Sequence, residues 1–327
     1  MWSIGWRALI AALAIVGFAA PSPAQDYPSK TVTIVVSLGA GSGMDVLVRL
    51  YAERLQAALG KSVVVENKPG AATMLAATQV ASAPADGHTM VVLTSSALAI
   101  NPTLYKQINY DPNRDFVPVS LYVKSPFILV VNPALPVHSV PELLKFAKDA
   151  KPPLNYASVG AGVLQHLSME FTKSRFGLDM VHVPYRNTGQ SITDIAAGHV
   201  ALGFVEAGAS IPLIKQGKLR ALAVSSSTRL PLLPDVPPFS EASGASDYEA
   251  VSWHTLLVPA KTPQPIVDRL HTEMKKIMSA PDMKEKASNI GLIPVDTPSV
   301  AGISDYIRSE QAKWGSLVEK LGLKGTQ

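Results

Sequence analysis

The 327-residue chain has no cysteine, which excludes disulfides, thiolate zinc sites, iron–sulfur ligation and cysteine nucleophiles. It also lacks any run of five or more charges of one sign, and 29 Lys and Arg against 25 Asp and Glu leave a net charge of +4. Such scattered charge is not typical of nucleic-acid binding. The seven histidines form no His-x-His or His-Glu-x-x-His pair. We therefore expect no metal, no cofactor and no nucleic-acid partner.

Long hydrophobic runs are missing after the first two dozen residues, since no later segment reaches the roughly 18 apolar residues of a membrane span. At the start of the chain, Arg7 precedes an apolar run over 8–20, and Pro21-Ser22-Pro23-Ala24 follows it. This pattern is typical of a secretory signal peptide over residues 1–24, with cleavage before Gln25. The alternative is an uncleaved N-terminal helix.

From Thr31 onward, strand patterns alternate with amphipathic helical patterns, and short segments with Gly or Pro connect them. Continuous apolar strands of this kind suit a mostly parallel sheet with helices on both faces. The first α/β unit is expected to contain strands at 31–36, 62–66 and 90–94 and helices at 44–59 and 72–83. Extended segments at 116–119 and 127–131 then cross to a second unit.

The second unit opens at a helix whose start, Ser139-Val140-Pro141-Glu142, matches a capping box with reciprocal bonds between Ser139 and Glu142. Further strands of this unit are expected at 154–157, 180–183, 201–205 and 219–224, and helices at 163–175 and 189–197. A strand at 252–258 is expected to return to the first unit, and helices at 263–279, 281–290 and 299–321 finish the chain. We predict two lobes joined by crossing segments. Lobe 1 comprises 25–125 and about 251–298, lobe 2 comprises 126–250, and the C-terminal segment 299–327 packs across the lobes.

Two similar glycine-rich segments follow strands, one in each unit: Ser37-Leu38-Gly39-Ala40-Gly41 and Ser158-Val159-Gly160-Ala161-Gly162. Each leads into a helix. Such loops expose consecutive backbone amides beside a helix N-terminus, which favours anions without using Lys or Arg. If the lobes face each other, a molecule with a negative group at each end could bridge them. The alternative is that both segments are ordinary strand-to-helix turns.

Enzymatic interpretations find less support in the sequence. A dinucleotide-binding loop would need a third glycine where Met44 stands, although Glu66 is placed for a ribose contact. A serine hydrolase elbow would need a glycine where Tyr156 stands, two residues before Ser158. His166 lies one turn into the helix after the second glycine loop, where it either reaches the site or packs in the helix.

A series of motifs resembles the periplasmic solute-binding proteins of tripartite tricarboxylate transporters, often called the Bug family. The motifs are Tyr27-Pro28-Ser29-Lys30-Thr31, the glycine loop ending in Asp45 with Arg49 after it, Val65-Glu66-Asn67-Lys68-Pro69-Gly70-Ala71, Ala85-Asp86-Gly87-His88-Thr89, Asp115-Phe116-Val117-Pro118-Val119, Val183-Pro184-Tyr185-Arg186, Gly217-Lys218-Leu219-Arg220 and Pro234-Asp235-Val236-Pro237. The resemblance covers nearly all of the chain after residue 24.

This resemblance implies an α/β, two-lobed periplasmic binding protein of the type II, Venus-flytrap class, with a mostly parallel sheet in each lobe. Such a protein is no enzyme: it closes on a small carboxylate and delivers it to the permease subunits of a membrane transporter. Asp45 is interpreted as fixing the loop amides. By position, the ligand-binding residues would be Leu38, Gly39, Ala40, Gly41, Ser42, Met44, Ser95, Ser96, Ser158, Gly160, Ala161, Gly162, His166, Tyr185, Arg186 and Glu206.

Leu38 and Met44 depart from the usual family pattern, and we expect them to line the cleft with apolar surface. This favours a dicarboxylate with an apolar or aromatic body, such as terephthalate, over citrate or malate. Two other functions remain open on the same fold: an exported enzyme that does not use NAD, and a ligand-dependent sensor module. We expect a periplasmic monomer.

Overall fold

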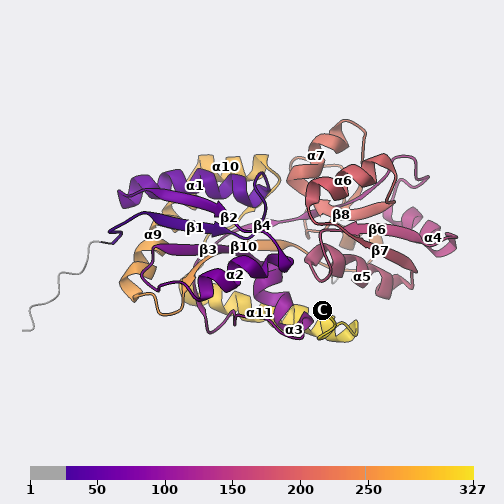
Figure 1. Ribbon diagram of the computed structural model, residues 1–327. Coiled ribbons are helices and arrows are strands. Elements are labelled where there is room, and N and C mark those ends of the chain that lie inside the picture. The colour runs from indigo at the N-terminus through magenta and orange to yellow at the C-terminus, as the bar shows by residue number, and fades with distance from the viewer. Residues whose placement is uncertain (1–26, 247) are drawn as a thin grey trace, which may run out of the picture.

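The computed structural model describes residues 27–246 and 248–327, which form two α/β lobes side by side (Figure 1). The expected signal peptide over 1–24 lies outside the described residues. In the part of the chain that the structure describes, no helix is both long enough and apolar enough to span a bilayer.

Lobe 1 is built on a six-stranded sheet with the order β11-β4-β10-β3-β1-β2. Its strands are β1 (Val32–Val36), β2 (Val63–Asn67), β3 (Thr89–Thr94), β4 (Phe116–Ser125), β10 (Ser252–Pro259) and β11 (Ile293–Pro294). β1 pairs in parallel with β2 and β3, as the continuous apolar runs predict. β10 returns from the second lobe and inserts antiparallel between β3 and β4.

Lobe 2 repeats this plan on a five-stranded sheet with the order β7-β6-β8-β5-β9. Its strands are β5 (Phe127–Val131), β6 (Leu154–Ser158), β7 (Met180–Pro184), β8 (Leu202–Glu206) and β9 (Arg220–Val224). β6 pairs in parallel with β7 and β8, and β5 is antiparallel to β8 and β9. Each sheet is therefore mixed, where a mostly parallel one was expected: β10, which arrives from lobe 2, and the short β11 are antiparallel in lobe 1, and β5, which arrives from lobe 1, is antiparallel in lobe 2.

Helices cover both sheets. In lobe 1 they are α1 (Gly43–Leu59), the 3-10 turn η1 (Ala71–Thr73), α2 (Met74–Ala81), the π-helical turn η2 (Ser96–Ile100), α3 (Asn101–Leu104), α9 (Gln264–Ser279), α10 (Pro281–Asn289) and α11 (Val300–Lys320). In lobe 2 they are α4 (Val140–Asp149), α5 (Leu164–Phe176), α6 (Thr188–Ala197), α7 (Ala207–Lys215) and α8 (Phe239–Ser243). The short α7, which contains Pro212, was not among the expected helices.

The structure confirms one of the two hydrogen bonds expected of the capping box at the start of α4. The Ser139 hydroxyl accepts a hydrogen bond from the Glu142 amide at 3.3 Å, as expected. The Glu142 carboxylate, however, accepts from the His138 amide at 2.7 Å and not from Ser139. The glutamate therefore satisfies the donor one residue earlier, and the helix start is still closed by two side-chain contacts.

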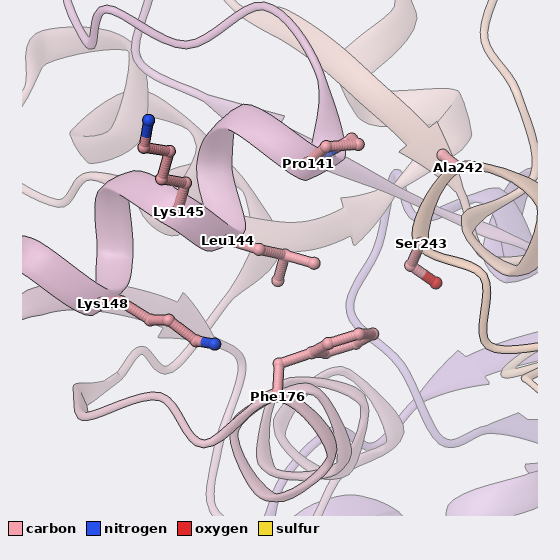
Figure 2. Close-up of a pocket in the computed structure, with 7 residues that line it drawn as sticks. All are labelled: Pro141, Leu144, Lys145, Lys148, Phe176, Ala242 and Ser243. Carbon is pink, nitrogen blue, oxygen red and sulfur yellow. The ribbon is translucent and has the colours of Figure 1, made fainter.

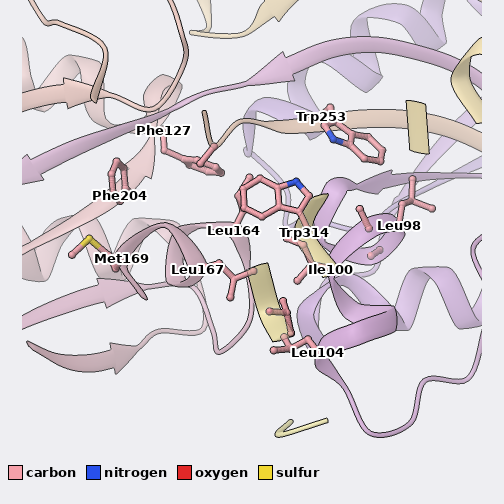
Figure 3. Close-up of a cluster of buried hydrophobic side chains, with 14 of the residues drawn as sticks. Leu98, Ile100, Leu104, Phe127, Leu164, Leu167, Met169, Phe204, Trp253 and Trp314 are labelled. Atoms are coloured by element: carbon pink, nitrogen blue, oxygen red, sulfur yellow. The ribbon is translucent and has the colours of Figure 1, made fainter. Parts of the chain in front are cut away.

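A hydrophobic cluster crosses between the lobes beside the connecting strands (Figure 3). Leu104 from α3 and Trp314 from α11 join Leu164 and Leu167 from α5 in this cluster. Helix α11 packs on η2, α3 and β4. That α11 packs across both lobes, and the predicted boundaries at 125 and about 251, stay predictions.

Candidate functional site: two glycine loops at facing strand ends

The two glycine loops lie where the parallel strands of the two lobes end. One connects β1 to α1, and the other connects β6 to α5. Helix α4, which precedes β6, lies at the end of lobe 2 far from lobe 1, so β6 runs back toward lobe 1 (Figure 1). Direct contact confirms this approach: a Cβ built on Gly162 would lie 1.7 Å from the Cδ2 atom of Leu104. The second loop thus touches lobe 1.

The first loop is held by the start of α1. Ser42 caps the helix, and its hydroxyl accepts a hydrogen bond from the Asp45 amide at 3.2 Å. One Asp45 carboxylate oxygen accepts from the Gly41 amide at 2.9 Å. The other accepts from Arg49 at 3.0 Å and from the Asn67 side chain at 2.9 Å. The interpretation that Asp45 fixes the loop is confirmed.

The second loop is held by two histidines. The Gly162 amide donates to Nδ1 of His166 at 3.0 Å. The Ser158 hydroxyl lies 2.8 Å from the Gly160 carbonyl oxygen, 3.3 Å from the Gly160 amide and 2.6 Å from Nε2 of His182. His166 is buried. His166 thus holds the second loop through its Nδ1, and its contact with a ligand stays a prediction.

Five loop amides are left available. Within residues 27–246 and 248–327, the amides of Leu38, Gly39, Ala40, Val159 and Ala161 have no hydrogen-bond partner. Gly39 and Ala161 are half-buried and Ala40 is exposed. Unpaired amides at the start of helices are donors suited to a carboxylate. Each loop therefore offers at least one free donor, and the loops belong to different lobes.

Leu38 and Met44, both expected to line the site, lie differently. Leu38 is half-buried and packs against the hydrophobic core of lobe 1. Met44 is only 1% exposed and lies inside that core, with its sulfur 3.8 Å from the Ser37 hydroxyl. This differs from the apolar lining expected of Met44, because its side chain is buried among the core residues of lobe 1. Only Leu38 keeps accessible apolar surface.

Ser95 and Ser96 lie at the end of β3, beside the first loop's strand. Both are buried. The Ser95 hydroxyl donates to the hydroxyl of Ser252 at 3.1 Å, which ties β3 to the returning strand β10. Ser95 therefore serves the connection between the lobes in this structure.

Tyr185 and Arg186 follow strand β7, and Glu206 is the last residue of β8. The Tyr185 hydroxyl donates to Asp194 at 2.8 Å, and burial and this carboxylate raise the pKa of Tyr185 to about 12. Arg186 is exposed, and no ion pair among the described residues includes it. Glu206 is half-buried, and burial raises its pKa to about 7.

The sequence did not identify Asn67, which supports the first loop, or His182, which supports the second. The parallel register pairs Tyr156 with His182, so their side chains lie on one face of the sheet next to that of Ser158. This register brings His182 beside Ser158, and the sequence alone does not show it. The Ser158–His182 distance of 2.6 Å resembles a nucleophile–base pair. Ser158 is buried, however, and its hydroxyl also lies 2.8 Å from the Gly160 carbonyl.

A surface cavity of about 360 Å³ lies elsewhere, on lobe 2 (Figure 2). It is lined by Pro141, Leu144, Lys145, Lys148, Phe176, Ala242 and Ser243. These residues come from α4, α8 and the last residue of α5, away from the glycine loops. Within the described ranges, no three metal-ligating side chains come together.

Comparison with known proteins agrees with this geometry. Residues 47–323 match the family described as tripartite tricarboxylate transporter family receptor. The UPF0065 protein in the tcbD-tcbE intergenic region of Pseudomonas sp. strain P51 is 32% identical over 329 residues, which cover 99% of this chain and 97% of that protein.

Similar solved structures come from the same class. The structure of R. palustris Rpa4515 with adipate has a TM-score of 0.83 and 34% identity, covering 90% of this chain and 98% of that one. Periplasmic binding protein BugD has a TM-score of 0.82 and 29% identity, covering 91% and 99%. MatC from Rhodopseudomonas palustris with bound malate has a TM-score of 0.79 and 27% identity, covering 89% and 100%.

The fold therefore defines a two-lobed binding protein, with a mixed sheet in each lobe and two crossing strands between them. More narrowly, the chain belongs to the tripartite tricarboxylate transporter receptor family. The resemblance read from the sequence motifs is confirmed.

Proposed function

We propose that the protein is a periplasmic solute-binding protein that captures a small dicarboxylate between its lobes and delivers it to a tripartite tricarboxylate-type permease. One carboxylate would bind the amides of Gly39 and Ala40, and the other the amide of Ala161. The observation that carries this proposal is that these three amides lack a partner in the described chain, on loops of both lobes. The ligands named for Rpa4515 and MatC, adipate and malate, are dicarboxylates and support it.

The free energy of binding requires hydrogen bonds from both lobes. A hydrogen bond to a charged group contributes roughly 1.5–3 kcal/mol. A micromolar dissociation constant needs about 8 kcal/mol beyond the entropy lost on association. One or two such bonds from a single loop do not reach this value. Hydrogen bonds from both loops and burial of the ligand body on closure are therefore both required.

Of the residues proposed by resemblance, Arg186 fits a direct role best, because it is exposed and has no ion-pair partner among the described residues. It lies after β7, next to the second loop's strand β6. A guanidinium there would pair with the carboxylate bound by lobe 2. We propose Ser42, Ser95 and Ser96 as lesser contributors, since the Ser42 and Ser95 hydroxyls already have protein partners.

We further propose a ligand with an apolar body, such as terephthalate. Leu38 supports this, because it is the half-buried apolar residue of the first loop. Met44, buried in the core, no longer contributes to the argument. A compact hydroxylated acid such as malate would leave the surface of Leu38 without an apolar partner.

Export through a cleaved signal peptide, a monomeric state and the absence of catalysis complete the proposal. The exported-enzyme alternative has one favouring observation, the Ser158–His182 pair. The sensor alternative uses the same fold and site, and differs only in the partner that the closed form contacts.

Isothermal titration calorimetry on the chain without residues 1–24 tests the proposal with terephthalate, adipate, malate and benzoate. We expect one dicarboxylate per chain to bind, with terephthalate tighter than malate and benzoate weakest. No binding of any dicarboxylate would refute the function, whereas tighter binding of malate would refute only the apolar body. Turnover of p-nitrophenyl acetate that Ser158→Ala abolishes would favour the enzyme.

A further inference from the structure

Each glycine loop is held by an equivalent hydrogen bond, but the acceptor is a carboxylate in one loop and an imidazole in the other. In each loop, the amide of the second glycine donates to the side chain four residues later. Gly41 donates to the Asp45 carboxylate at 2.9 Å, and Gly162 donates to Nδ1 of His166 at 3.0 Å. Asp45 and His166 are each the third residue of the helix that follows. An imidazole in lobe 2 thus replaces a carboxylate in lobe 1.

The two acceptors also differ in the charge of the residue that stands four positions later. The charge of Asp45 is met by Arg49, four residues later. Burial alone would raise the pKa of Asp45, but hydrogen bonds from Arg49, Gly41 and Asn67 hold it below its ordinary value. Four residues after His166 stands an acid instead, Glu170. The first loop is therefore held by an ionised group with its own counter-ion.

Behind the second loop, aromatic and charged side chains enclose His166. The His182 ring lies 4.2 Å away, centroid to centroid, and the Tyr156 ring lies 6.3 Å away. Glu170 accepts from the Tyr156 hydroxyl at 2.6 Å and from Lys173 at 2.7 Å. The Glu170 charge is therefore already paired, which leaves the two imidazoles to serve the loop.

His182 supports the loop through Ser158. When the Ser158 hydroxyl donates to the Gly160 carbonyl, its oxygen accepts from the Gly160 amide and from Nε2 of His182. This assignment places the His182 proton on Nε2. The two histidines thus fix the first and second glycines of the loop, one each.

We propose that His166 and His182 are positioning residues which, as a pair of neutral imidazoles, hold the second glycine loop in the conformation that presents the Ala161 amide to a ligand carboxylate. This proposal rests on the proposed function for its ligand. Neutral acceptors place no negative charge behind the bound carboxylate, whereas Asp45 in lobe 1 needs Arg49 beside it.

The titration of the pair agrees with this role. Burial lowers the pKa of His166. Burial and the adjacent His166 lower the pKa of His182 to about 4. The groups facing the pair are Tyr156, Glu170 and Lys173. Both imidazoles are therefore neutral at pH 7, and protonation of His166 at acidic pH removes the Nδ1 acceptor that holds Gly162.

The test compares variants that keep the hydrogen bond with variants that remove it. His166→Asn and His182→Gln retain an acceptor and a donor, respectively, without titrating in this range, and His166→Ala and His182→Ala do not. His138→Asn, at an exposed histidine of lobe 2 whose backbone amide alone donates a hydrogen bond, is the matched control. Calorimetry at pH 7.5 with terephthalate and adipate gives the dissociation constants.

We expect the alanine variants to lose roughly tenfold or more in affinity, because His166→Ala leaves the buried Gly162 amide without its acceptor and His182→Ala removes the donor that holds the Ser158 hydroxyl. The Asn and Gln variants should stay within about threefold of the parent, as should the control. From pH 7.5 to 4.5, the parent should lose more affinity than a His166→Asn/His182→Gln double variant. The protonation of the ligand itself affects both proteins equally.

A measurement without ligand separates this inference from the proposed function. Glycine-selective ¹⁵N NMR should show slow hydrogen exchange for the Gly162 amide in the parent and in His166→Asn, and fast exchange in His166→Ala. Fast exchange in the parent, or equal exchange in both variants, would overturn the positioning role. A protected Gly162 amide in a parent that binds no dicarboxylate would refute the proposed function alone.

Discussion

Gly208 offers a perturbation that acts on the contact between the lobes and not on the ligand. It is the second residue of α7 in lobe 2, and it packs on the turn between α10 and β11 in lobe 1. A Cβ built on Gly208 would lie 2.4 Å from the carbonyl oxygen of Ile290. One built on Gly291 would lie 2.8 Å from the Gly208 amide nitrogen. In both cases the nearest atom belongs to the backbone of the other lobe.

A methyl group at Gly208 cannot be accommodated by a side-chain rotation, because the obstructing atom belongs to the main chain of the other lobe. Overpacking of this kind costs about 1–3 kcal/mol. If the lobes relieve it by separating, the cost falls on the closed, ligand-binding form. Since 1.4 kcal/mol is a factor of ten, Gly208→Ala should weaken dicarboxylate binding by roughly 5- to 150-fold.

Gly189→Ala is the matched control. Gly189 also lies in a helix of lobe 2, but its Cβ would meet only the Asn187 side-chain oxygen at an ordinary 3.6 Å. Calorimetry with adipate on the parent and both variants is the assay. Gly208→Ala binding within twofold of the parent, with unchanged unfolding in urea, would refute the reasoning that this contact sets the closed form.

Three further predictions concern stability, each measured by urea unfolding. Glu206 has a pKa raised to about 7, so the folded form holds a proton that the unfolded chain releases near pH 4.5. The free energy of unfolding that Glu206 contributes should therefore be fully present below pH 4.5 and should fall, by at most about 3 kcal/mol, as pH rises through 7. Glu206→Gln should remove this loss. An unchanged pH profile in this variant would contradict the assignment. Leu104→Ala should cost about 2–5 kcal/mol, because Leu104 is fully buried between the lobes; a cost under about 1 kcal/mol would mean that the lobes do not rely on this contact. Glu310 accepts from the indole nitrogens of Trp253 at 3.1 Å and Trp314 at 2.9 Å, so Glu310→Ala should cost about 1–3 kcal/mol per unpaired N–H, whereas Glu310→Gln should restore much of it.

Much of the fold was readable from hydrophobic periodicity. The strand expected at 90–94 is β3, Thr89–Thr94, and the helix expected at 299–321 is α11, Val300–Lys320. Local signals set these bounds. Helix α7 was not expected; it contains Pro212, and its second residue, Gly208, packs against the backbone of lobe 1 at Ile290 and Gly291.

The candidate site was readable in outline only. The matching Gly-Ala-Gly segments predicted two equivalent loops, and the structure places both at facing strand ends. The direction of a side chain at a helix start could not be read, so Met44 was expected at the surface and lies in the core. The role of His182 depends on its register with Tyr156, a pairing between residues 26 positions apart that no local pattern encodes.

The central claim is that backbone amides of two glycine loops, one per lobe, hold the two ends of a single dicarboxylate. Glycine- and alanine-selective ¹⁵N NMR, with terephthalate or adipate added to saturation, tests it most directly. We expect the resonances of Gly39, Ala40 and Ala161 to shift together along one binding curve, while Gly60 and Gly177, at the far ends of α1 and α5, stay in place. Saturable binding that leaves either loop unshifted would contradict the claim.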